Sequence, residues 1–203
     1  MKKTLLILMI LTFSISIMAQ EKTKQKEIGL VFNNFDNFGL SLKTGNEKSL
    51  WRFNTLMITS SNQDEISESN EIKQKNIGFG IKFGKEYRKE IVENFEFRYG
   101  LDLSFNYYKY EYENTEDYSY NYNQRTYKKT TYQPGINLVF GFNYVINDNI
   151  VIGAELLPHF SYITGTSTNT DYNFTVVESD ISGISYGLSN TSALLSISYR
   201  FRK

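Results

Sequence analysis

The chain contains no cysteine, so no disulfide can stabilise its fold. It also has no excess of either charge, with 22 basic and 22 acidic residues among 203. A balanced charge gives no electrostatic reason to expect nucleic acid as a partner. The sequence lacks a metal-ligand cluster, a phosphate-binding glycine loop and a nucleotide-binding motif. We therefore expect no metal and no cofactor.

Long apolar runs are also missing, with one exception at the amino terminus. There a basic start precedes an apolar run from Leu5 to Ile17, and Ala19 follows it. This layout predicts a secretory signal peptide that is cleaved after Ala19. The run is shorter than the ~20 residues that a spanning helix needs. We expect residues 1–19 to be the signal peptide and residues 20–203 to be one exported domain.

The rest of the chain alternates apolar and polar residues, and no convincing helical period is present. Alternation places successive side chains on opposite faces of a strand. In the clearest stretch, 95–107, Phe, Tyr and Leu share one face, while Glu96, Arg98 and Asp102 share the other. Eight strands are predicted: 27–32, 37–43, 50–57, 76–84, 95–107, 135–144, 149–162 and 193–201.

The connectors between these stretches alternate in length. Those after the second, fourth and sixth strands are short or moderate: 44–49, 86–94 and 146–149. Those after the third, fifth and seventh strands are long and polar: 60–74, 110–131 and 164–185. An up-and-down membrane barrel has tight turns on the periplasmic side and longer extracellular loops, which is the same rhythm.

Alternation by itself fits a soluble barrel or sandwich as well as a membrane barrel. Two features favour the membrane. The polar faces are built mainly from Gly, Ser and Asn, which suit a crowded lumen better than a water-facing surface. Aromatic residues lie toward the strand ends, as interfacial girdles require: Trp51, Tyr107, Tyr144, Tyr162 and Tyr199. We predict an all-β fold, a closed up-and-down antiparallel transmembrane β-barrel of eight strands, with the last strand paired to the first.

The leader, the eight strands and the closing SISYRF resemble the small outer-membrane β-barrel proteins of the OmpA/OmpX type, especially the porin-like barrels of Bacteroidota. The resemblance implies a monomer surrounded by outer-membrane lipid and assembled by the barrel-assembly machinery. In such families a final aromatic residue belongs to the assembly signal, and Tyr199 and Phe201 would provide it here. Arg202 and Lys203 follow the aromatic residues, which departs from that pattern.

If the apolar faces contact lipid, eight charged side chains enter the lumen: Lys43, Arg52, Lys82, Glu96, Arg98, Asp102, Glu155 and Arg200. They must pair, because an isolated buried charge is costly. We expect Lys82 to lie near Glu96 and Arg98, close to a shared periplasmic turn. Two interpretations stay open: ion pairs that seal the lumen, or a narrow passage for small solutes.

The single histidine, His159, precedes Ser161 by two residues. Outer-membrane enzymes that deacylate lipid A use a similar pair, in which the base activates the hydroxyl. The pair shares the parity of Glu155, however, and that parity is assigned to the lumen. The alternative to an acyl hydrolase is a rim histidine that is hydrogen-bonded inside the barrel.

Nine of the 16 tyrosines lie in residues 106–132. Tyrosine offers a large amphipathic contact area at low entropic cost, so a recognition loop for an extracellular protein or glycan is one interpretation. Its candidate contact residues are Tyr112, Tyr118, Tyr120 and Tyr122. The other is a hairpin that extends both strands, with tyrosines paired across it. Taken together, the sequence predicts a non-enzymatic barrel with a sealed lumen and a structural, adhesive or surface-recognition role.

Overall fold

The computed structural model describes residues 25–34, 37–67, 70–118, 121–171, 173, 175–189 and 192–202. The predicted signal peptide, residues 1–19, lies outside this part of the chain. The strands are β1 (Gln25–Asn34), β2 (Asn37–Asn46), β3 (Ser49–Ile66), β4 (Asn70–Val92), β5 (Phe95–Tyr118), β6 (Asn121–Ile146), β7 (Ile150–Leu156), β8 (His159–Thr170), β9 (Val176–Gly187) and β10 (Ala193–Arg202). In the described residues, no helix is long and apolar enough to cross a membrane.

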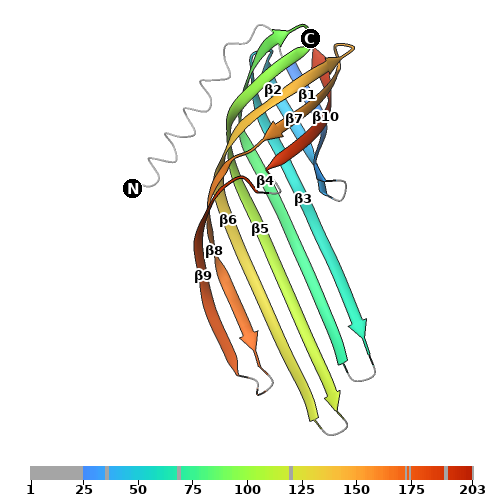
Figure 1. The fold of residues 1–203 in the computed structure, drawn as a ribbon, viewed down its shortest axis with the longest axis vertical. Coiled ribbons are helices and arrows are strands. Elements are labelled where there is room, and N and C mark those ends of the chain that lie inside the picture. Colours follow the sequence, from blue (N-terminus) through green and yellow to red (C-terminus); the bar gives the residue numbers. More distant parts are fainter. Residues whose placement is uncertain are drawn as a thin grey trace, which may run out of the picture.

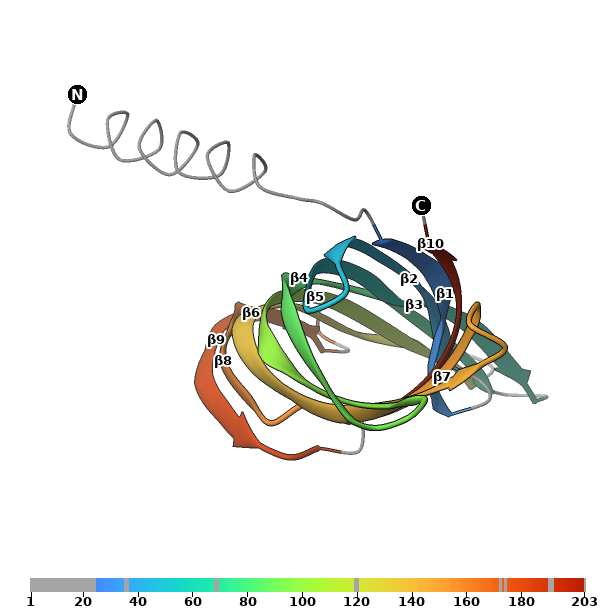
Figure 2. The ribbon, with the colours of Figure 1, turned by 90° about the horizontal axis from the view of Figure 1, so that it is seen from above.

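Eight of the strands close into a ring. Each strand from β1 to β6 pairs antiparallel with the next, β7 pairs with β6 and β10, and β10 pairs with β1. Figure 2 shows this ring from above. The last strand therefore pairs with the first, as the sequence predicts, and no edge remains at the seam. Closure matters because a backbone group without a hydrogen bond is costly in lipid.

The stagger of the strands determines the width of the barrel. The pairing register can be followed from Ser104 on β5 once around the ring, through β4, β3, β2, β1, β10, β7 and β6. It returns to β5 at Asn94, just before the strand begins, which is ten residues before Ser104. For eight strands, this stagger corresponds to a tilt of about 40° and a backbone radius of about 8 Å. Such an interior is just wide enough for side chains to fill it.

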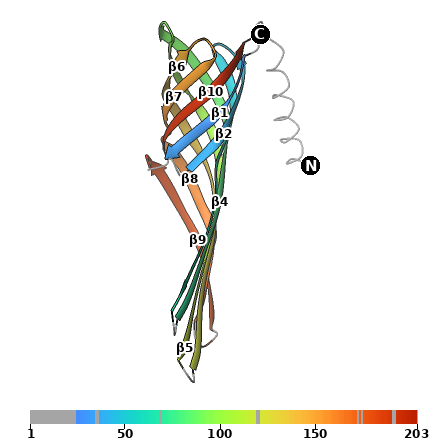
Figure 3. The ribbon, with the colours of Figure 1, turned by 90° about the vertical axis from the view of Figure 1, so that its right-hand side faces the viewer.

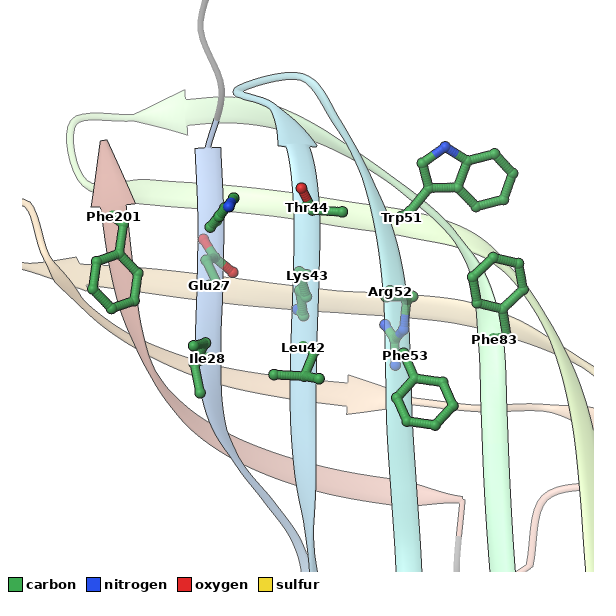
Figure 4. Close-up of a pocket in the computed structure, with 11 residues that line it drawn as sticks. Glu27, Ile28, Leu42, Lys43, Thr44, Trp51, Arg52, Phe53, Phe83 and Phe201 are labelled. Carbon is green, nitrogen blue, oxygen red and sulfur yellow. The ribbon is translucent and has the colours of Figure 1, made fainter. Parts of the chain in front are cut away.

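The polarity of the ring is the reverse of that of a soluble barrel. On β7, Val151, Gly153 and Glu155 are buried while Ile150 and Ile152 are exposed. On β1 to β3, Glu27, Lys43 and Arg52 are buried, and the exposed row consists of Ile28, Leu42 and Phe53 (Figure 4). Leu101, Leu103, Phe140, Phe142, Leu195 and Ile197 continue this exposed apolar belt around the ring. The fold is therefore a closed up-and-down transmembrane β-barrel, and the soluble alternative is wrong.

Four strands of the ring continue far beyond it, and two further strands join them. The outer parts of β3, β4, β5 and β6, together with β8 and β9, form an open sheet, which we call the extension (Figures 1 and 3). The β5–β6 pairing continues to Tyr118 opposite Asn121, and the β4–β5 pairing to Asn70 opposite Glu116. β8 follows β7 after Pro158 and pairs with β6, and in the described residues β9 pairs only with β8.

The extension corrects the prediction of three long loops at 60–74, 110–131 and 164–185. Most of these residues lie in paired strands, and the hairpin alternative for residues 106–132 is confirmed. In these segments mostly polar residues occupy both faces of the strands. Hydropathy therefore does not alternate there, although Tyr and Thr favour a strand backbone.

A second correction concerns residues 86–94, which the sequence analysis treats as a connector. β4 continues to Val92, and the turn is only Glu93–Asn94, with Asn94 at a positive φ of 65°. Asparagine tolerates this left-handed conformation better than most residues. The longer strand adds Glu86 and Arg88 to the interior of the barrel.

The seam between β1 and β10 provides a test of closure. A Cβ on Gly29 would overlap the Ile197 carbonyl oxygen and the Ser198 hydroxyl, so we expect Gly29→Leu to destabilise the seam by about 1–3 kcal/mol. The control is Gly183→Leu in the extension, where a Cβ meets nothing within 4 Å. Heat-modifiable gel mobility after refolding should show less folded barrel for Gly29→Leu alone. Equal folding of the two variants would contradict the close pairing of β1 with β10.

Candidate functional site

The lumen receives every charged residue that the sequence analysis assigns to it. The side chains of Lys43, Arg52, Lys82, Arg98, Asp102, Glu155 and Arg200 are buried, and that of Glu96 is partly buried. Three further charged residues belong to the same cluster: Glu27, Glu86 and Arg88. Glu86 and Arg88 continue the parity of Lys82 along β4. Continuing the alternation of strand 76–84 past its predicted end, from Lys82 to residues 84, 86 and 88, would have identified both residues.

Glu86 lies at the centre of the cluster and is fully buried. Its Oε2 accepts hydrogen bonds from Lys43 Nζ at 2.9 Å and from Arg52 Nη1 at 3.0 Å. Its Oε1 accepts a hydrogen bond of 2.6 Å from Arg88 Nε. Arg98 Nη1 lies 3.7 Å from Oε2. One carboxylate thus faces four cations, which come from β2, β3, β4 and β5.

Arg52 joins this centre to the opposite wall. Its Nη1 and Nη2 each donate a hydrogen bond of 2.8 Å to the two oxygens of Glu155 on β7. Such paired contacts match the planar guanidinium to the planar carboxylate. Arg98 Nη2 lies 3.3 Å from Glu155 Oε2. Asp102 is held less tightly, since Arg52 Nε lies 3.3 Å from its Oδ1 and neither of its oxygens accepts a hydrogen bond from the described residues.

Two more paired contacts lie toward the end of the ring where the chain ends. Arg88 donates to both oxygens of Glu27, at 2.6 and 2.7 Å. Arg200 donates to both oxygens of Glu96, each at 2.8 Å, and its Nε donates to Glu27 Oε1 at 2.7 Å. Asn143 on β6 donates to Glu96 at 3.0 Å. The network therefore contacts all eight strands of the ring.

Lys82 does not lie where the sequence analysis places it. The register sets Lys82 opposite Ser104 on β5 and Asn54 on β3, whereas Arg98 lies opposite Arg88. The expected proximity to Glu96 and Arg98 is wrong because β4 is longer than predicted, which moves the turn away from Lys82. Instead, Lys82 lines a cavity of about 540 Å³ on the side of the ring nearer the extension.

His159 and Ser161 line the same cavity, but they do not form the predicted pair. His159 Nε2 lies 3.1 Å from the Ser185 hydroxyl, and the Ser161 hydroxyl accepts a hydrogen bond of 2.6 Å from Gln133. Within the described residues, no carboxylate contacts His159. Both side chains face the cavity and not the lipid belt, which does not suit a lipid A deacylase. No three acidic or histidine side chains of the described chain gather as a metal site requires.

Several tyrosines of the extension share its inner face. Tyr110 and Tyr112 share the parity of Asp102, so they continue the inner face of the barrel wall. Tyr112 lies opposite Tyr127, and the rings of Tyr110 and Tyr127 are 6.1 Å apart. Tyr118 and Tyr122 belong to the ends of β5 and β6, and Tyr120 lies outside the described residues.

The outer face of the extension carries ion pairs. Lys109 Nζ lies 2.8 Å from Glu111 Oε1. This hydrogen bond lowers the pKa of the Glu111 carboxyl and raises the pKa of Lys109. Lys73 and Glu71 form a similar pair at 2.9 Å, which raises the pKa of Lys73. Pairs as exposed as these contribute little to stability.

The sequence matches no protein-family model and no curated protein. Among solved structures, the chain is similar to a major outer membrane protein from Thermus thermophilus, at 11% identity and a TM-score of 0.43, over 90% of this chain and 100% of that one. It is also similar to CarO from Acinetobacter baumannii, at 12% identity and a TM-score of 0.36, over 87% and 96% of the two chains. At these TM-scores, the barrel assignment rests on the strand pairing and the burial pattern.

The network predicts a large difference between two conservative substitutions. Glu86→Gln leaves several buried cations short of a partner, and we expect it to cost about 3–5 kcal/mol. Asp102→Asn removes only one ionic contact, and Arg52 keeps its bonds to Glu86 and Glu155. We expect it to cost about 1 kcal/mol. Urea unfolding in lipid vesicles, followed by the fluorescence of Trp51, measures both, and equal costs would contradict the central role of Glu86.

Proposed function

We propose that the protein is an outer-membrane barrel with a sealed lumen, whose extension recognises an extracellular protein or glycan. The outer-membrane location is supported by the predicted signal peptide and by the apolar belt around the ring. The finer resemblance, to OmpA/OmpX-type barrels of Bacteroidota, rests on the sequence pattern. Tyr199 and Phe201 lie exposed on β10 with their rings 4.7 Å apart, so the assembly machinery can reach both side chains.

The sealed lumen is the first support for this proposal. The paired contacts of Arg52, Arg88 and Arg200 cross the interior and satisfy carboxylates on β1, β5 and β7. An eight-stranded ring encloses little space beyond its own side chains. A solute would have to break several buried ion pairs to pass, which costs far more than thermal energy. A general porin function is therefore disfavoured.

The extension is the observation on which the recognition role rests. Six strands project from the end of the ring opposite the carboxyl terminus (Figure 1). In a barrel with periplasmic termini, that end faces the exterior of the cell. An ordered sheet holds its side chains in place before a partner arrives, which lowers the entropic cost of binding. Its inner face presents Tyr110, Tyr112 and Tyr127, and tyrosine is favoured in binding surfaces.

The two faces of the extension provide a matched test. The first variant replaces Tyr110, Tyr112 and Tyr127 by threonine, and its control replaces the outer-face residues Lys109, Glu111 and Lys128 by threonine. Threonine preserves strand propensity in both. We expect at least a tenfold loss of binding to glycan arrays and matrix-coated surfaces for cells that display the first variant alone. Equal binding by both variants, with both barrels folded, would contradict recognition by the inner face.

A narrow solute channel is the competing function, and conductance separates the two. Because the network fills the lumen, we expect the purified barrel to give no steady current in planar lipid bilayers. The comparison is a double variant, Arg52→Ala with Glu155→Ala, which removes both partners of one paired contact. It opens space in the lumen and leaves neither charge of that pair without its partner. Steady conductance by the unaltered protein would contradict the sealed lumen.

A further inference from the structure

The floor of the 540 Å³ cavity holds two buried donors that the network leaves unused. Lys82 is 7% exposed, and no carboxylate of the described residues forms an ion pair with it. Glu155 and Asp102 act on Lys82 electrostatically, but both are already engaged by Arg52. Asn137 is 5% exposed, and its Nδ2 has no hydrogen-bond partner in the described chain. A buried donor without an acceptor is costly, and such groups in native structures need an explanation.

The charge of the lumen indicates what is missing. Six cations lie in the cluster: Lys43, Arg52, Lys82, Arg88, Arg98 and Arg200. Five carboxylates face them: Glu27, Glu86, Glu96, Asp102 and Glu155. One positive charge is left over, and Lys82 is the cation that lines the cavity. A ligand with a single negative charge would balance the cluster, whereas a dianion would add an excess charge beside Asp102 and Glu155.

The remaining lining indicates the rest of the ligand. Hydroxyl and amide groups form part of the cavity lining, beside apolar side chains such as Leu157 and Leu194: Ser104, Asn106, Thr131, Gln133, Ser161 and Ser185. The imidazole of His159, whose Nε2 lies 3.1 Å from the Ser185 hydroxyl, also lines the cavity. Groups of this kind pair with ligand hydroxyls, which they can both donate to and accept from. The volume falls within the range of small-molecule sites.

We propose that this cavity binds a small hydroxylated monocarboxylate, with the carboxylate on Lys82 Nζ and Asn137 Nδ2 and the ligand hydroxyls against the serine and amide side chains. The site opens toward the extension and is closed behind by the ion-pair network. It captures a solute at the outer end of the barrel without passing it on. The site is independent of the tyrosine face, so its failure leaves the proposed recognition role untouched.

The test is isothermal titration of the purified, folded barrel in detergent with D-glucuronate, D-glucose and D-glucose 6-phosphate as probes. Glucuronate differs from glucose by its carboxylate, so we expect glucuronate to bind at least tenfold more tightly than either of the other two. Lys82→Gln should weaken glucuronate binding at least tenfold, and Lys82→Arg should keep most of it. The matched control is Lys85→Gln, which removes a lysine of the same strand that lies over the Trp51 ring at 4.6 Å, outside the cavity.

A second readout uses the unaltered protein alone. Glucuronate should raise the temperature of barrel unfolding, followed by heat-modifiable mobility, and glucose at the same concentration should not. This measurement stands even if Lys82→Gln does not fold. Absence of glucuronate binding, equal affinity for glucose, tighter binding of the phosphate, or an unchanged affinity in folded Lys82→Gln would each overturn the proposal.

Discussion

The neutralisation of buried charge inside a narrow ring is the constraint on which the rest of this structure depends. Glu86 accepts from three cations and lies near a fourth, and the arginines of β3, β4 and β10 each contact both oxygens of a carboxylate on another strand. Because these bonds cross the lumen, they hold the strands at one stagger as well as filling the space between them. Removal of one partner would leave a buried charge unpaired, so the network acts as a unit.

The seal proposed above would place any activity of the protein at the outer end of the ring. Four strands of the ring continue past the apolar belt and form, with β8 and β9, a sheet that has tyrosines on its inner face and ion pairs on its outer face. Between that sheet and the network lies a cavity with both polar and apolar lining, and Lys82 is one of its lining residues. The two proposed binding roles therefore use separate surfaces, the sheet and the cavity, above a ring that ion pairs fill.

The parts that sequence reasoning predicted are those where one face meets lipid. Leu101 and Leu103 alternate with Asp102 because lipid and lumen make opposite demands on neighbouring residues. The same logic identified eight members of the lumen cluster. It failed at Glu86 and Arg88, which lie within a stretch of mixed charges that suggests a turn, and at residues 110–131, where both faces of the sheet are polar. In both places the backbone is a strand although hydropathy does not alternate.

By itself, the sequence determined the strand class, the closed barrel and the row of side chains that faces inward, since a period of two assigns faces without knowledge of neighbours. Only the tertiary structure decided which charges pair. Lys82 lies opposite Ser104 and not near Glu96, because its partners depend on strand length and stagger, which are properties of neighbouring strands together. For the same reason, only the folded ring shows that one of the six cations of the lumen cluster, Lys82, forms no ion pair with a described residue and lines the outer cavity.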